Sequence, residues 1–260
     1  MKHILITNDD GYEAVGLKAL AEALRPIAKI TVVAPATEKS ACGHSLTLTK
    51  PLKLICVDDD FYKLDDGTPT DCIFLALNTL FKDDFKPDLV ISGINIGANM
   101  GEDITYSGTA SAAMEAALQG INSIAISQVC KDRCADIKTV EDFALAQQAI
   151  VKIVEQIFDK SFPLGSRKFL NVNIPPIKPQ NCEGFKITKA GFRHYGNDVH
   201  THRNPRGEEY HWIGLHPLIW EPSSDGSCDF EAIKQCFVSI SPIHLDMTSY
   251  EDIKTLKDWM

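Results

Sequence analysis

Apolar, strand-like runs alternate with helical patterns over the first half of the chain. The strand-like runs are residues 3–7, 30–34, 88–92 and 123–127, and the helical patterns are residues 17–24, 71–81 and 108–119. This alternation predicts an α/β fold in which a mostly parallel sheet carries helices on both faces. Ligands of such sheets bind beyond the carboxyl ends of the strands, so functional residues are expected in the loops that follow them.

The second half of the chain continues this pattern and then changes. An amphipathic helix is predicted near residues 140–158 and a strand at residues 169–174, before a proline-rich break. Beyond the break, short strand-like segments are separated by turn-rich stretches, and we expect hairpins that extend from the core. These segments are residues 185–190, 209–215 and 237–241.

Charge and cysteine content narrow the function classes. With 35 acidic and 26 basic residues the formal net charge is -9, which argues against a nucleic acid polymer or an acidic membrane as partner. No apolar run reaches the roughly 18 to 20 residues of a membrane helix, and no signal-peptide pattern precedes the first strand, so we expect a cytoplasmic protein.

The eight cysteines are scattered along the chain, which favours free thiols. Cys130 and Cys134 have the spacing of half a zinc site, but no second half completes it.

Two carboxylates stand side by side where the first strand ends. Neighbouring side chains on a strand point to opposite faces, so Asp9 and Asp10 share a ligand only where the chain has left strand geometry. Gly11 permits that turn. Two carboxylates suit a hard divalent cation such as Mg²⁺ or Mn²⁺. The alternative is that one acid caps the following helix and the other is solvated.

A polar loop follows the second strand and reaches the same edge of the predicted sheet. Ser40, His44 and Ser45 are its candidate oxygen or nitrogen donors. Loop serines are common turn formers, and the spacing does not choose among these residues.

A glycine-rich loop with Asn95 and Asn99 follows the third strand, and the next helix is predicted to begin at Ser107, Gly108 and Thr109. Backbone N–H groups and hydroxyls at a helix N-terminus favour a bound anion such as phosphate. The alternative is a flexible crossover loop with an ordinary serine N-cap. The loop matches neither G-x-G-x-x-G nor the P-loop pattern. Because all three loops fall on one edge, the sequence predicts a metal ion next to a phosphate.

Six motifs, found in order along essentially the whole chain, resemble the SurE family of survival proteins, which are metal-dependent 5'-nucleotidases. They are "ITNDDG", "VVAPATEKSACGHSLTL", "DGTPTDC", "PDLVISGINIGANMGEDITYSGTASAAMEAA", "NPRGEEYHWIG" and "CDFEAIKQCFVSISPIHLD". The chain departs from the family pattern modestly, at Cys42, His44 and Cys236.

The resemblance implies one divalent cation per subunit, Mg²⁺ or Mn²⁺, anchored by the catalytic residues Asp9 and Asp10. It adds Ser40 and Asn95 as further metal ligands, and it places the remaining site residues beside the phosphate. These are Asn99, Ser107, Gly108 and Thr109.

The resemblance also implies a Rossmann-like α/β catalytic core over residues 1–180. Residues 181–260 would form a β-hairpin and C-terminal extension of the same functional domain, exchanged between the subunits of a homodimer or homotetramer. The implied substrates are nucleoside monophosphates, with 3'-nucleotides and short polyphosphate as additional ones.

We expect a phosphomonoesterase in which metal-activated water attacks the phosphate, although direct attack by an aspartate stays open. Two rival functions are a metal-dependent nucleotide-sugar glycosyltransferase and a nucleotide-sensing protein that does not hydrolyse its ligand.

Three histidines carry weaker hypotheses. His44 is a candidate general acid for the leaving group, against the alternative of a hydrogen-bonding surface residue. His200 and His202 would share a face of a strand, but no third ligand completes a metal site, so a structural or interface role is expected.

Overall fold

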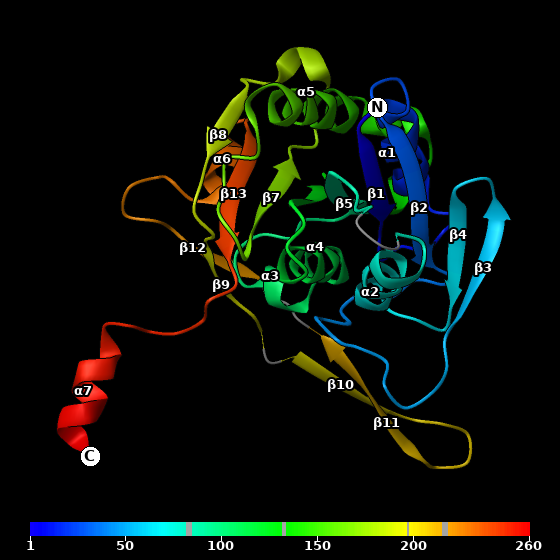
Figure 1. Cartoon of the computed structure of the whole chain (residues 1–260). Helices are drawn as coiled ribbons and strands as arrows, with labels where there is room; N and C mark the ends of the chain where they lie inside the picture. The colour runs from blue at the N-terminus through cyan, green and yellow to red at the C-terminus, as the bar shows by residue number, and fades with distance from the viewer. Residues whose placement is uncertain (82–84, 132–133, 197, 215–217) are drawn as a thin grey trace.

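One central sheet organises the computed structural model, which describes residues 1–81, 85–131, 134–196, 198–214 and 218–260. Its strands are β1 (His3–Thr7), β2 (Lys29–Pro35), β3 (Lys53–Asp58), β4 (Phe61–Asp65), β5 (Leu89–Ile96), β6 (Ser123–Gln128), β7 (Lys168–Ile174), β8 (Phe185–Ile187) and β13 (Val238–His244). They lie in the order β3-β4-β2-β1-β5-β6-β7-β13-β8 (Figure 1).

The middle of this sheet is parallel. Each neighbouring pair from β4 through β2, β1, β5 and β6 to β7 runs in the same direction, whereas β3 and β13 pair antiparallel to their neighbours β4 and β7. Strand β1 has the sequence HILIT and is buried at every position. Strands covered on both faces need such continuous apolar runs. The predicted α/β fold with a mostly parallel sheet is confirmed.

Helices cover both faces of the sheet. They include α1 (Val15–Leu24), α2 (Pro69–Thr79), α4 (Gly108–Leu118) and α5 (Ala144–Lys160). Side chains alternate across a strand, so Ile4 and Ile6 belong to the core packed by α1 and α5, and Leu5 belongs to the core packed by α2 and α4 (Figure 1). Helix α2 begins where Thr68 and Asp71 form a capping box.

The remaining elements are short. They are α3 (Asp103–Tyr106), α6 (Asp229–Lys234), α7 (Asp252–Trp259), the two-stranded sheet of β10 (Asp198–Arg203) with β11 (Glu209–Gly214), that of β9 (Phe192–His194) with β12 (Ile219–Glu221), and the 3-10 helices Cys134–Asp136, Val140–Phe143 and Pro179–Asn181. Helix α7 buries none of its residues and lies away from the body of the molecule (Figure 1). Among the described residues, no helix is long and apolar enough to cross a membrane.

Only part of the predicted C-terminal hairpin arrangement is found. Strand β11 pairs antiparallel with β10 as a hairpin, as expected, while residue 215 of the predicted segment lies outside the described residues. The other two predicted segments instead join the main sheet, β13 beside β7 and β8 beside β13. Pairing with β13 satisfies the backbone groups that the edge of β7 would otherwise expose. The hairpin of β3 and β4 was not predicted, because its strands are short and partly exposed.

The expectation that all cysteines are free thiols is wrong for one pair. Cys130 and Cys134, which have the spacing of half a zinc site, form a disulfide. A spacing of four residues places two side chains within reach of each other, which serves a disulfide as well as a metal. The other six cysteines are free.

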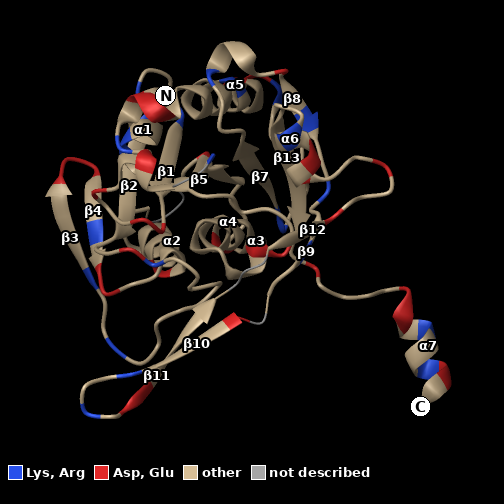
Figure 2. Ribbon diagram, turned by 180° about the vertical axis from the view of Figure 1, so that it is seen from behind, with Lys and Arg blue, Asp and Glu red and all other residues tan. Residues whose placement is uncertain are grey.

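Charged residues are spread over the fold. In the view of Figure 2, lysines and arginines lie on several elements with aspartates and glutamates between them. Residues of both signs therefore occur on the same elements in this view.

Candidate active site

A pocket of about 900 Å³ lies at the carboxyl ends of β1 and β5. Five of the residues predicted from the sequence line it, namely Asp9, Ser40, Asn95, Asn99 and Ser107. Parallel strands that end at one edge bring these separate loops together, which is the position expected for a ligand in an open α/β sheet.

Asp9 is buried against the start of helix α4. Its carboxylate accepts hydrogen bonds from the backbone N–H of Thr109 at 3.0 Å and from the Thr109 hydroxyl at 2.5 Å. Gly108 permits this approach, since a Cβ there would lie 2.8 Å from the Cβ of Asp9. Burial raises the pKa of Asp9, and the Thr109 bonds oppose that rise. The helix N-terminus therefore faces the Asp9 carboxylate, which it stabilises in the charged form.

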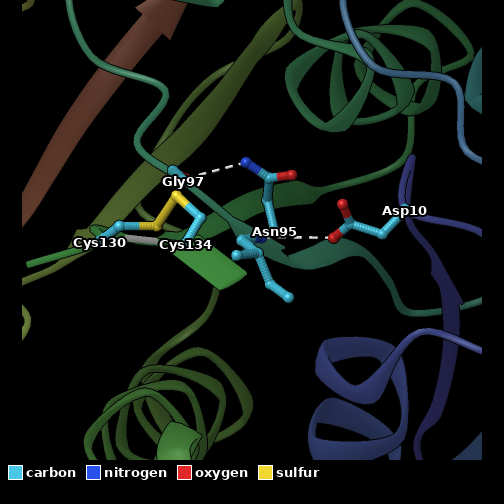
Figure 3. Close-up of a disulfide and its surroundings, with 6 residues drawn as sticks. Asp10, Asn95, Gly97, Cys130 and Cys134 are labelled. Carbon is cyan, nitrogen blue, oxygen red and sulfur yellow. Dashed lines mark hydrogen bonds between the residues drawn. A yellow bond between two sulfur atoms is a disulfide. The ribbon is translucent and has the colours of Figure 1, made fainter. Parts of the chain in front are cut away.

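Asp10 follows at the same strand end, where Gly11 adopts a φ of 99° and turns the chain. The Asp10 carboxylate accepts a 3.3 Å hydrogen bond from the backbone N–H of Ile96, and Figure 3 shows it directed toward the chain beside Asn95. Burial, and then the neighbouring charge of Asp9, raise the pKa of Asp10 to about 7. The buried Asp9 carboxylate and the partly buried Asp10 carboxylate repel each other, and a cation between them would relieve that repulsion.

Asn95 and Ser40 supply neutral oxygens. The Asn95 amide nitrogen donates to the carbonyl of Gly97 at 2.9 Å, which orients the amide oxygen for use as a ligand (Figure 3). Ser40 is exposed and donates its hydroxyl proton to Glu38 at 2.8 Å, so its oxygen lone pairs can serve as acceptors.

Asn99 is held by a cluster of buried polar side chains. The Asn173 side chain accepts from the Asn99 backbone N–H and donates to its carbonyl, each at 3.0 Å. Asn171 donates to the same carbonyl at 2.8 Å, and the Asn99 amide nitrogen donates to Ser127 at 2.8 Å. Strand β7 thereby fixes the glycine-rich loop.

Ser107 caps helix α4, since its hydroxyl accepts from the backbone N–H of Ala110 at 3.0 Å. The ordinary N-cap interpretation of this serine is correct, and the same side chain also lines the pocket. Gly108 and Thr109 are buried and contact Asp9. Within the described part of the chain, they are not lining residues.

His44 points to a different partner. Its Nε2 lies 2.9 Å from the buried carboxylate of Glu115 on helix α4. The described pocket lining does not include His44. His200 and His202 both lie on strand β10 of the hairpin.

The pocket lining also includes residues that carried no predicted role, among them Asp103, Tyr106, Arg193 and Tyr195. Asp103 and Tyr106 belong to α3, and Arg193 and Tyr195 lie in and after β9. Tyr106 could have been found because it directly precedes Ser107. Arg193 and Tyr195 could not, because only the folded chain returns them to this pocket.

The donor set suits a hard cation. Asp9, Asp10, Asn95 and Ser40 offer carboxylate, amide and hydroxyl oxygens, the ligands that Mg²⁺ and Mn²⁺ prefer. Across the described residues, no group of three or more His, Cys, Asp or Glu side chains forms a metal site. Oxygen donors from two acids and two neutral side chains fit the ion that the resemblance implies.

Fold and site together define a Rossmann-like α/β protein that gathers oxygen donors beside a helix N-terminus. The family model described as survival protein SurE matches residues 4–197, and the chain belongs to this family. A protein of Aliarcobacter butzleri named 5'-nucleotidase SurE is 72% identical over 260 residues, covering 100% of this chain and 99% of the relative. A protein of Helicobacter hepaticus with the same name is 61% identical over 265 residues, with 100% and 99% covered.

The fold has a solved counterpart. The crystal structure of the SurE protein from Aquifex aeolicus is similar with a TM-score of 0.83 and 40% sequence identity, covering 99% of each chain. The second half of the chain, with its hairpin and C-terminal extension, is therefore part of the shared architecture.

Proposed function

We propose that this chain is a divalent-metal-dependent 5'-nucleotidase that hydrolyses nucleoside monophosphates to nucleoside and phosphate. One observation carries the proposal: the pocket joins the Asp9 carboxylate, the Asn95 amide and the Ser107 N-cap at the strand ends. The relatives named 5'-nucleotidase SurE, at 72% and 61% identity, support the same activity. They do not favour the glycosyltransferase or the nucleotide sensor.

Asp9, Asp10, Ser40 and Asn95 would hold one Mg²⁺ or Mn²⁺ per subunit. When bound, this ion neutralises phosphate charge and lowers the pKa of water. The protein prepares the site by fixing Asp9 on Thr109 and the Asn95 amide on Gly97.

Asn99 and Ser107 are the side chains that reach the phosphate in this proposal. Both line the pocket and both are held in place, Asn99 by strand β7 and Ser107 by its capping bond. In this proposal Gly108 and Thr109 contribute indirectly to phosphate binding, because they pack against Asp9. Polar groups fixed before the reaction stabilise developing charge without reorganising.

In the reaction, a water oxygen attacks phosphorus, the bond from phosphorus to the ribose oxygen breaks, and that oxygen leaves with a proton. Water is favoured over Asp9 as nucleophile because Thr109 engages the Asp9 carboxylate with two hydrogen bonds. Short polyphosphate and 3'-nucleotides are further substrates to test.

The proposed function is tested by phosphate release from a panel of nucleoside 5'-monophosphates with chelator, Mg²⁺ or Mn²⁺. Wild-type protein is expected to release phosphate only with metal, and Asp9→Asn is expected to lose about a hundredfold or more in kcat/KM. Release that persists with chelator, or an Asp9→Asn variant of full activity, would contradict the metal anchor. A folded wild-type protein that binds nucleotide but releases no phosphate would favour the nucleotide-sensing function instead.

We also propose a cytoplasmic homodimer or homotetramer assembled by exchange of the C-terminal extension. Helix α7 supports this because Ile253, Leu256 and Trp259 are exposed along it. The expected division at residue 180 falls between β7 and β8 of one sheet. Light scattering of the full chain and of a variant truncated after residue 246 tests the assembly, and an unchanged mass on truncation would oppose it.

A further inference from the structure

A second set of side chains lines the same pocket and has no part in the chemistry above. It comprises Asp103, Tyr106, Arg193 and Tyr195. Helix α3 supplies the first two, and the chain in and after β9 supplies the others. Their mutual contacts show what kind of surface they form.

The charge of Arg193 is already balanced. Its guanidinium lies 2.6 Å from the Asp103 carboxylate, and the two side chains are only 13% and 14% exposed. The guanidinium also stacks 3.8 Å from the centre of the Trp220 ring. This partly buried arginine is held in place by these two partners, and its charge is paired with that of Asp103. This part of the pocket wall is therefore electrically neutral.

The same ion pair fixes an aromatic ring. The Tyr195 hydroxyl donates to the Asp103 carboxylate at 2.5 Å, and burial together with this bond raises the Tyr195 pKa. The Tyr195 ring meets that of Tyr106 edge to face, with centroids 6.0 Å apart and planes at 81°. This is a preferred geometry for aromatic pairs.

Tyr106 is the exposed member of the pair. Its residue is 59% accessible, although it lines the pocket and directly precedes the helix cap Ser107. Its backbone carbonyl accepts from Gly43 at 3.0 Å, which attaches it to the loop that carries Ser40. An immobilised, exposed aromatic ring next to the phosphate position suits a flat aromatic group attached to that phosphate.

We propose that the Tyr106 ring is the surface on which the nucleobase of the substrate stacks, and that Tyr195, Asp103 and Arg193 are positioning residues that hold it. This inference rests on the proposed nucleotidase function and names how the nucleoside is recognised. Because every base has an aromatic face, the device accepts purines and pyrimidines alike and selects against phosphate esters without a base.

The test compares adenosine 5'-monophosphate with ribose 5-phosphate, which lacks only the base. In the metal-loaded full chain, Tyr106→Leu keeps an apolar side chain but removes the ring. We expect its selectivity, the ratio of kcat/KM for the nucleotide to that for the sugar phosphate, to fall about 5- to 150-fold. Tyr106→Phe keeps the ring and is expected to restore the wild-type ratio.

The positioning residues have their own readout. Tyr195→Phe, which breaks only the bond to Asp103, is expected to raise the nucleotide KM more than it lowers kcat. An unchanged selectivity ratio in Tyr106→Leu would overturn the proposal, whether kcat/KM falls for both substrates or for neither. So would a Tyr106→Phe variant as impaired as Tyr106→Leu.

Calorimetric binding separates this inference from the proposed function. If wild type releases no phosphate from either compound, the nucleotidase proposal fails, but the stacking proposal still predicts that Tyr106→Leu binds the nucleotide more weakly than wild type by a similar factor. Equal nucleotide binding by wild type and variant would then reject stacking on Tyr106.

Discussion

The Asp9 carboxylate and Thr109 are joined by two hydrogen bonds, one from the backbone N–H at 3.0 Å and one from the hydroxyl at 2.5 Å. The contact ties the end of the first strand to the first turn of helix α4, 100 residues further along. It fixes an acidic side chain at the positive end of a helix, where negative charge is favoured.

Replacing Thr109 with valine should therefore weaken catalysis more than folding. Valine keeps the shape and the backbone N–H but removes the hydroxyl bond to Asp9, and bonds to charged groups contribute about 1.5 to 3 kcal/mol. We expect kcat/KM for nucleoside monophosphates to fall by about tenfold or more. Thr109→Ser, which keeps the hydroxyl, is the matched control, and equal kcat/KM in valine and serine variants would contradict this role.

Asn173→Leu should loosen the loop that carries Asn99. The apolar side chain leaves the Asn99 backbone N–H and carbonyl without the two bonds that Asn173 makes, at a cost of about 1 to 3 kcal/mol in the free energy of unfolding. Denaturant unfolding measures this loss. The same substitution at the exposed Asn181 is the control and should have little effect. A stability loss at Asn181 as large as at Asn173 would contradict the argument.

His44→Gln distinguishes a general acid from a hydrogen-bonding residue. Glutamine retains a donor for Glu115, so we expect kcat to stay within about threefold of wild type, because general acids contribute about a hundredfold or more. The measurement is kcat across pH. A hundredfold loss, or disappearance of one limb of the pH profile, would reinstate His44 as the acid.

Reduction of the Cys130–Cys134 disulfide should lower stability modestly. The bond closes a very short loop, for which the constraint on the unfolded chain amounts to about 2 kcal/mol. Calorimetry with and without reductant should show a lower Tm for reduced wild type. The double variant Cys130→Ser, Cys134→Ser should have the Tm of the reduced protein, and reductant should not change it. A change of Tm with reductant in that variant would point to another disulfide.

His3 should make stability fall on the acid side. The ring is buried and bonds to Thr31, and burial, followed by the charge of Lys29, lowers its pKa. Below about pH 6.5 the unfolded chain takes up a proton that the folded chain resists, so stability is fully present above that pH and is lost as pH falls. In His3→Gln the drop in Tm between pH 7.5 and 5 should be smaller, and parallel Tm curves would contradict this.

Much of the fold follows from local pattern. Strand β1 was predicted with its observed bounds, and helix α4 nearly so, because buried parallel strands are continuous apolar runs and a serine cap marks the helix start. Strands β8 and β13 were seen as strands, but their partners were not. The pairing of a strand depends on which edge of the sheet is open, and the residues next to the strand in the sequence do not indicate this.

The site divides in the same way. Asp9, Asp10, Asn95 and Ser107 stand out in the sequence because carboxylates, amides and a helix cap after strand ends have local signatures. The bond from Thr109 to Asp9, the clamp of Asn173 on Asn99 and the turning of His44 to Glu115 have none.

The sequence by itself determined the alternating α/β core, the oxygen donors at its strand ends and the family to which the chain belongs. The tertiary structure alone decided the hydrogen-bond partners of those donors. It also brought Arg193 and Tyr195 to the pocket beside Asp103 and Tyr106. The reason is physical: periodicity and capping act between residues a few positions apart, whereas hydrogen bonds and ring contacts depend on distances in space that only the folded chain fixes.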